Sequence, residues 1–115
     1  MVGLQLPWPI ASLNIWQRMH WTRRRKIGRA IAGYIGVARS GAASTPRQVV
    51  ITRIGPRVLD HDNLVGGCKP ILDALVRGRW LVDDSPDWVT VEYRQERAKG
   101  RPTATLIQIT EIGPA

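Results

Sequence analysis

The sequence predicts an α+β fold in which a small mixed β-sheet packs against two main helices. Three observations indicate this class: short β-branched runs with alternating apolar residues, stretches with apolar residues at helical spacing, and the order strand, helix, strand, helix, strand, strand. With 115 residues, we expect one domain over 1–115 with one modest core. Because the chain has no Phe, that core must use Val, Ile, Leu and Trp.

The N-terminal half contains two predicted strands around a long helix. Residues 2–6 alternate apolar with small or polar side chains, as a half-buried strand does. We expect residues 12–14 to form a loop, after which Thr22 can cap a helix whose apolar residues follow helical spacing through residues 27–38. The β-branched run 48–54 predicts the second strand.

A second helix is predicted within residues 63–77. Its apolar stripe lies in the second half of that range, where Pro70 suits a first helical turn and Gly78 suits a stop. Gly66 and Gly67 argue against one unbroken helix from the start of the range.

The last part of the chain has the pattern of two strands. Residues 88–94 and 103–110 both alternate apolar with polar side chains. The connection 98–102 is short and contains Gly and Pro, so we expect the two strands to pair as a hairpin.

Negative charge is concentrated in one segment of a basic chain. The net charge is +8, yet no Asp or Glu precedes Asp60, and all six aspartates lie between Asp60 and Asp87. That segment carries −3 and the rest of the chain +11. A basic field attracts polyanions such as nucleic acid or an anionic membrane surface. Crowded carboxylates repel one another, so they indicate either a bound cation or solvated loop and cap residues.

Two acidic motifs can supply ligands for a divalent metal. If the first segment is extended, Asp60 and Asp62 point to one side and can converge on a hard cation such as Mg²⁺ or Mn²⁺. Either residue can instead cap the helix that follows. Of the adjacent residues Asp83 and Asp84, at most one is expected to join them. We favour Asp84, with Asp83 as the alternate, and the other is expected in a turn.

Lys69 and Asp73 are four residues apart and face each other if both are helical. They can form a surface ion pair, or Lys69 can contact a scissile phosphate. Cys68 is expected to be a small buried side chain.

A basic block interleaved with Trp16 and Trp21 is the candidate DNA-binding surface. Its residues are Arg18, Arg23, Arg24, Arg25, Lys26 and Arg29. The alternative is a solvated helix face. The two tryptophans can stack on unpaired bases, although core packing is the more frequent role of Trp.

Other partners are not indicated. A single cysteine excludes an internal disulfide, and two histidines with one cysteine lack the usual ligand spacing of zinc. No apolar run approaches the ~18 residues that cross a membrane, and the first residues lack a charged leader. We therefore expect no membrane partner, no small-molecule cofactor and a cytoplasmic location.

Taken together, the motifs resemble the RusA family of Holliday junction resolvases, in the versions carried by phages and prophages. The similar segments, in order, are Leu6-Pro7 through Ser12-Leu13-Asn14, Asp60-x-Asp62-Asn63-Leu64, Lys69-x-x-x-Asp73-Ala74-Leu75 and Asp83-Asp84. They cover most of the chain, and their order and spacing carry the resemblance.

The resemblance implies a homodimeric, Mg²⁺-dependent endonuclease of a bacterial or phage-infected cell, in which Mn²⁺ can substitute. Its substrate would be a four-way DNA junction, nicked symmetrically on two opposing strands in recombination and repair. By position, Asp60, Asp62 and Asp84 would be catalytic metal ligands and Lys69 a catalytic cation. The accessory positions would be Asp73, Asp83 and Asn14.

One departure from the family pattern concerns Lys69. The chain carries extra residues near 65–67, which change the offset of Lys69 from the carboxylates. Two other functions stay open at this point. One is a non-catalytic, structure-selective DNA-binding protein, and the other is a nuclease that acts on different branched DNA.

Overall fold

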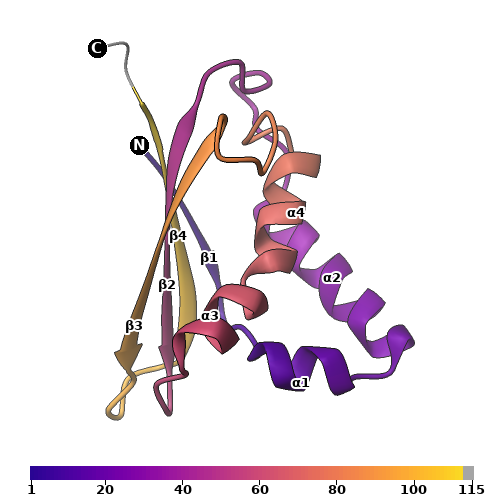
Figure 1. Cartoon of the computed structure of the whole chain (residues 1–115), viewed down its shortest axis with the longest axis vertical. Coiled ribbons are helices and arrows are strands. Elements are labelled where there is room, and N and C mark those ends of the chain that lie inside the picture. Colours follow the sequence, from indigo (N-terminus) through magenta and orange to yellow (C-terminus); the bar gives the residue numbers. More distant parts are fainter. Residues whose placement is uncertain (113–115) are drawn as a thin grey trace.

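A four-stranded sheet carries all the helices of residues 1–112, which the computed structural model describes, on one of its faces (Figure 1). The elements are β1 (Val2–Leu6), α1 (Leu13–Arg18), α2 (Trp21–Ile35), β2 (Arg47–Gly55), α3 (His61–Gly67), α4 (Lys69–Arg77), β3 (Val89–Arg97) and β4 (Ala104–Glu111). The predicted α+β class with a mixed sheet is confirmed.

The strand order is β1-β4-β2-β3, with β2 and β3 parallel and the other neighbours antiparallel. The predicted hairpin of the last two strands is therefore wrong, since β2 lies between them. The burial patterns of β2 and β3 explain why β2, and not β3, is the neighbour of β4. In β2, Ile51 and Ile54 are buried on opposite faces, as in a central strand, whereas β3 exposes Thr90, Glu92 and Arg94 on one face and suits an edge.

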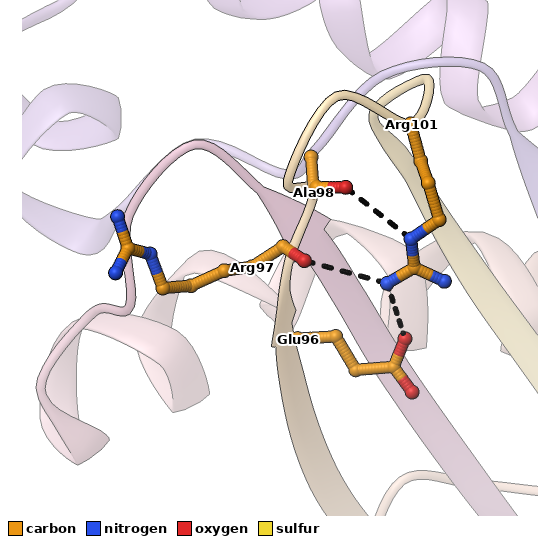
Figure 2. A network of polar contacts seen from close by, with 4 residues as sticks. All are labelled: Glu96, Arg97, Ala98 and Arg101. Atoms are coloured by element: carbon orange, nitrogen blue, oxygen red, sulfur yellow. Dashed lines mark hydrogen bonds and ion pairs between the residues drawn. The ribbon is translucent and has the colours of Figure 1, made fainter.

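The connection from β3 to β4 reaches past the end of β2. The backbone N–H of Ala98 donates to the carbonyl of Gly55, the last residue of β2, at 2.8 Å. Arg101 then closes the turn: its Nε donates to the Ala98 carbonyl at 3.2 Å, and its terminal nitrogen donates to the carbonyl of Arg97 at 3.3 Å. The same nitrogen pairs with Glu96 at 3.1 Å, and the side chain of Arg97 points away (Figure 2). This network holds the connection that separates β3 from β4.

The hydrophobic core lies between the sheet and the helices. Its largest fully buried apolar side chains come from three strands and α4: Leu6, Val49, Ile51, Ile107, Ile71 and Leu75. They alternate along the strands, which places them on the helix-facing side. Within the described residues, no helix is both long and apolar enough to cross a bilayer.

The helix starts differ from the sequence prediction. Ser12 is the N-cap of α1, its hydroxyl accepting from the backbone N–H of Ile15 at 3.2 Å, so the predicted loop 12–14 already contains the start of a helix. The N-cap of α2 is His20 rather than Thr22, because the His20 ring nitrogen accepts from the Thr22 backbone at 3.2 Å. Ala38 is buried but lies beyond the end of α2.

Two glycines lie inside α3, and the break from α4 comes at Cys68. A Cβ at Gly67 would collide with the carbonyl oxygen of Ala11, and one at Gly66 would crowd Leu13 at 2.6–2.9 Å. The glycines therefore let α3 pack closely on the chain before α1. Helix α4 forms over the predicted stripe, with Pro70 in its first turn and Gly78 at its end.

Replacing Gly67 with Ala tests this close packing. We expect Gly67→Ala to lower the free energy of unfolding by about 2 kcal/mol, because the Ala11 backbone must move to admit a methyl group. The matched control is Gly33→Ala in α2, where a Cβ meets nothing within 4 Å. There we expect a gain of roughly 0.5–1 kcal/mol from helix propensity. Urea denaturation measures both, and equal effects would contradict the packing described.

Candidate functional site

A row of polar side chains crosses the helix-facing side of the sheet near the ends of β2 and β3. Gln95 of β3 is the register partner of Arg53 of β2, which is in turn the partner of Thr105 of β4. Arg53 and Thr105 are buried, with 8% and 0% exposure. Buried polar groups need partners, and these find them in two loops rather than in one another.

The first of these loops joins β1 to α1. The Thr105 hydroxyl accepts from the N–H of Ile10 and donates to the carbonyl of Trp8, both at 2.9 Å. The Arg53 Nε donates to the carbonyl of Ile10, also at 2.9 Å. Three hydrogen bonds from the sheet therefore fix the loop just before α1.

The second loop joins β2 to α3. The Arg53 guanidinium donates to the carbonyl of Arg57 at 2.7 Å. The Gln95 side-chain amide both accepts from the N–H of Leu59 and donates to its carbonyl, each at 2.8 Å. Because Leu59 precedes Asp60, this row determines where the first acidic motif starts. Burial lowers the pKa of Arg53, although an arginine stays charged in a protein.

Asp60 is the N-cap of α3, as one of the two sequence interpretations expected. Its carboxylate accepts from the backbone N–H of Asn63 at 2.9 Å and from the Asn63 side-chain amide at 3.1 Å. These bonds lower the pKa of Asp60, the backbone bond most. Asp62 lies in the first turn of α3, so the expectation of an extended Asp60–Asp62 segment is wrong. Asn14 lies beside this motif, its N–H donating to the Asn63 side-chain oxygen at 2.9 Å.

Asp83 and Asp84 lie beyond the opposite end of α4, in the connection to β3 (Figure 1). They line a hollow of about 390 Å³ together with Asp73 and Arg77 of α4. Helix α4, with nine residues, is about 13 Å long and lies between the two acidic motifs. The ligands of one Mg²⁺ ion must all lie ~2.1 Å from it. Among residues 1–112, no three His, Cys, Asp or Glu side chains form a group that could hold a metal ion. The structure therefore does not unite Asp84 with the first acidic motif within one chain.

A basic groove runs between α2 and α4, and we call it the α2–α4 groove. It encloses about 620 Å³ and is lined by Leu13, Trp16, Arg25, Gly28, Arg29, Ala32, Gly66, Lys69, Pro70, Asp73, Ala74 and Arg77. Four of these side chains are cationic and only Asp73 is acidic. Lys69 thus faces this groove, and the described part of the chain shows no ion pair between Lys69 and Asp73.

The predicted basic block lies on α1 and α2. Arg18 ends α1, and the other five residues lie on the first two-thirds of α2, where all but the half-buried Arg24 are exposed. Trp21 is 54% exposed and carries the Arg25 guanidinium at 5.5 Å from its ring centroid, so it is not a core residue. Trp16 is half-buried.

Cys68 is fully buried, as the sequence predicted. Burial raises the pKa of its thiol to about 12. A thiolate nucleophile at this position is therefore excluded at neutral pH.

Sequence reasoning missed Arg53, Gln95 and Arg77. For Arg53 a signal was present, because it occupies an inward position in the alternation that begins with Val49 and Ile51. A charged residue in such a row indicates a buried polar contact. Gln95 offers the same signal, because it continues the inward alternation of Val89, Val91 and Tyr93. For Arg77 we find no comparable signal.

Comparison with known proteins adds no family to this picture: no protein-family model matches the chain, and no curated protein matches it either. The RusA resemblance thus rests on the sequence motifs alone.

Replacing Arg53 with Met tests the polar row. We expect Arg53→Met to lower the free energy of unfolding by about 2–4 kcal/mol, because the carbonyls of Ile10 and Arg57 lose their buried donor. The matched control is Arg94→Met on the exposed face of β3, where we expect a change within about 0.5 kcal/mol. Urea denaturation measures both. If the two variants lose the same stability, the row does not hold the loops.

Proposed function

We propose that the protein is a metal-dependent endodeoxyribonuclease that acts on branched DNA as a homodimer. Following the RusA resemblance, we take the four-way junction as its preferred substrate and recombination and repair as its setting.

The observation that carries the proposal is the position of the α2–α4 groove between the two acidic motifs. At one end the groove includes Leu13, the neighbour of Asn14, which is bonded to Asn63 of the first motif. At its other end it shares Asp73 and Arg77 with the hollow of the second motif. Cations along such a groove attract the phosphates of DNA. A strand lying in it would have carboxylates near both ends.

The metal-binding part of the proposal needs a second subunit. Asp60 and Asp62 offer two carboxylates near one helix start, which suit a hard cation but leave the predicted set incomplete. Asp84 of the partner subunit would complete it. When bound, Mg²⁺ supplies an activated water and neutralises charge that develops on a phosphodiester. The role of Asp60 as a cap fixes one ligand to the start of α3.

A symmetric dimer also suits the substrate. A four-way junction has approximate two-fold symmetry, and a C2 dimer presents two identical sites related by the same operation. Two matched nicks then follow from one docking event. Lys69 lines the groove, and in this proposal it would contact a phosphate there.

A non-catalytic DNA-binding protein is the second candidate. The hydrogen bonds of Asp60 favour it, because they give that carboxylate a structural role without any metal. Both candidates bind DNA in a salt-dependent way, so binding does not separate them. A nuclease for flaps or other branched DNA would keep the proposed chemistry and change only the substrate.

Replacing Asp62 with Asn separates the two candidates. We expect Asp62→Asn to lower Mg²⁺-dependent nicking of a four-way junction by more than about 100-fold, because a metal ligand is lost. Junction binding should stay intact or become tighter, since a negative charge near phosphate is removed. Removal of the metal with EDTA should abolish nicking by the wild-type protein. Gel assays of nicking and of binding measure these changes.

The matched control is Asp87→Asn, which makes the same charge change at an exposed residue outside both acidic motifs and should nick normally. Four-way, three-way and duplex substrates, assayed side by side, rank the possible targets. If the wild-type protein nicks none of them in Mg²⁺ or Mn²⁺, the nuclease proposal fails and the DNA-binding candidate stands.

A further inference from the structure

A second groove, on the other side of Trp16, is unused by the proposed chemistry. It encloses about 680 Å³, and we call it the tryptophan groove. Its walls come from the β1–α1 loop, α1, α2 and the α3–α4 junction, and they include Trp8, Trp16, Met19, Arg23, Lys26 and Ile27. This volume falls in the range of small-ligand sites and exceeds what one planar aromatic group needs.

The walls are fixed by contacts already described. Thr105 and Arg53 hold the backbone of Trp8 and Ile10 from beneath, with three hydrogen bonds of 2.9 Å. The Trp8 ring packs edge-on against Tyr34 of α2, with centroids 5.3 Å apart and planes at 77°. At the α3–α4 junction, Gly67 packs directly against the backbone of Ala11, because a Cβ there would collide with the Ala11 carbonyl oxygen. Contacts within the chain therefore hold the β1–α1 wall of the groove in place, which lowers the cost of ordering on binding.

The chemistry of the lining combines flat apolar surfaces with positive charge. Trp8 and Trp16 are both half-buried, so part of each indole remains open, and Met19 and Ile27 add apolar surface. Among residues 1–112, the charged side chains of the lining are Arg23 and Lys26, both exposed on α2, and no carboxylate lines the groove. An occupant that complements these walls has an aromatic ring and an adjacent negative charge.

We propose that the tryptophan groove receives one unpaired nucleobase of a branched DNA, stacked on Trp16, while Arg23 and Lys26 contact the flanking phosphates. This inference rests on the proposed action on DNA. Bases stack on aromatic side chains whatever their sequence, and cations beside the stack hold the backbone. A branch point is where bases leave the duplex stack at the lowest cost.

The position of Trp16 supports the same occupant. Trp16 and Pro70 line both the tryptophan groove and the α2–α4 groove, so the two hollows meet at these residues. A strand whose backbone follows the cations of the α2–α4 groove can thus place one base across Trp16. A second copy of this chain would instead have to offer an acidic apolar segment, and its acidic motifs are short and exposed.

The test compares binding of two junctions in EDTA, where cleavage plays no part. One four-way junction has an unpaired thymine at the branch point, and the other has an abasic tetrahydrofuran residue at the same place. We expect the wild-type protein to bind the thymine junction roughly 5- to 100-fold more tightly. Trp16→Leu should reduce this ratio to about one. Trp21→Leu, the matched control at an exposed tryptophan outside the groove, should keep the ratio.

A second pair of variants separates the base from the phosphates. Arg23→Gln and Lys26→Gln should weaken binding of both junctions equally and leave the ratio unchanged.

Equal affinity of the wild-type protein for the two junctions would overturn the inference, and this measurement needs no variant. A change of oligomeric state in Trp16→Leu with an unchanged ratio would overturn it too and would identify the groove as a protein interface. A base preference without any nicking would support the groove and reject the nuclease. Nicking without a base preference would support the nuclease and reject the base-binding groove.

Discussion

The buried Arg53 guanidinium is the interaction on which the rest of this structure depends. It lies in a sheet whose inward side is otherwise mainly apolar, and its Nε and one terminal nitrogen donate to the carbonyls of Ile10 and Arg57. Those carbonyls belong to two loops that are far apart in the sequence. Gln95 and Thr105, on either side in the register, bind the same loops. The described part of the chain gives Arg53 no carboxylate partner, and the cation is tolerated because backbone carbonyls accept its hydrogen bonds.

This arrangement connects the fold to both proposed sites. One loop forms a wall of the tryptophan groove, and the other delivers Asp60 to the start of α3. The same sheet positions therefore set the geometry of a base-binding hollow and of an acidic motif. Because α3 and α4 follow each other before the chain returns to β3, the second acidic motif lies beyond the end of α4 that is opposite α3 (Figure 1). The separation of the two motifs is thus a property of the fold rather than of a loose loop.

Periodicity was enough to predict the strands, α2 and α4, and it failed where burial or pairing decided the outcome. Helix α1 has six residues, none of them fully buried, so it is too short for a periodic pattern to reveal it. The last two strands look like a hairpin by spacing, but only the two-sided burial of β2 shows which strand is central. The clustering of aspartates in the sequence suggested clustering in space. The helices between residues 62 and 83 carry the two ends apart, and no local pattern encodes that distance.

The central claim is that two copies of the chain together build one acidic site from motifs that a single copy keeps apart. Mixing Asp62→Asn with Asp84→Asn tests it most directly. Each variant alone should be inactive, whereas the 1:1 mixture should recover about one quarter of the wild-type nicking rate, since half of the dimers then hold one intact site. If the wild-type protein nicks junctions but the mixture is no more active than either variant alone, the two motifs do not combine across subunits and the account is contradicted.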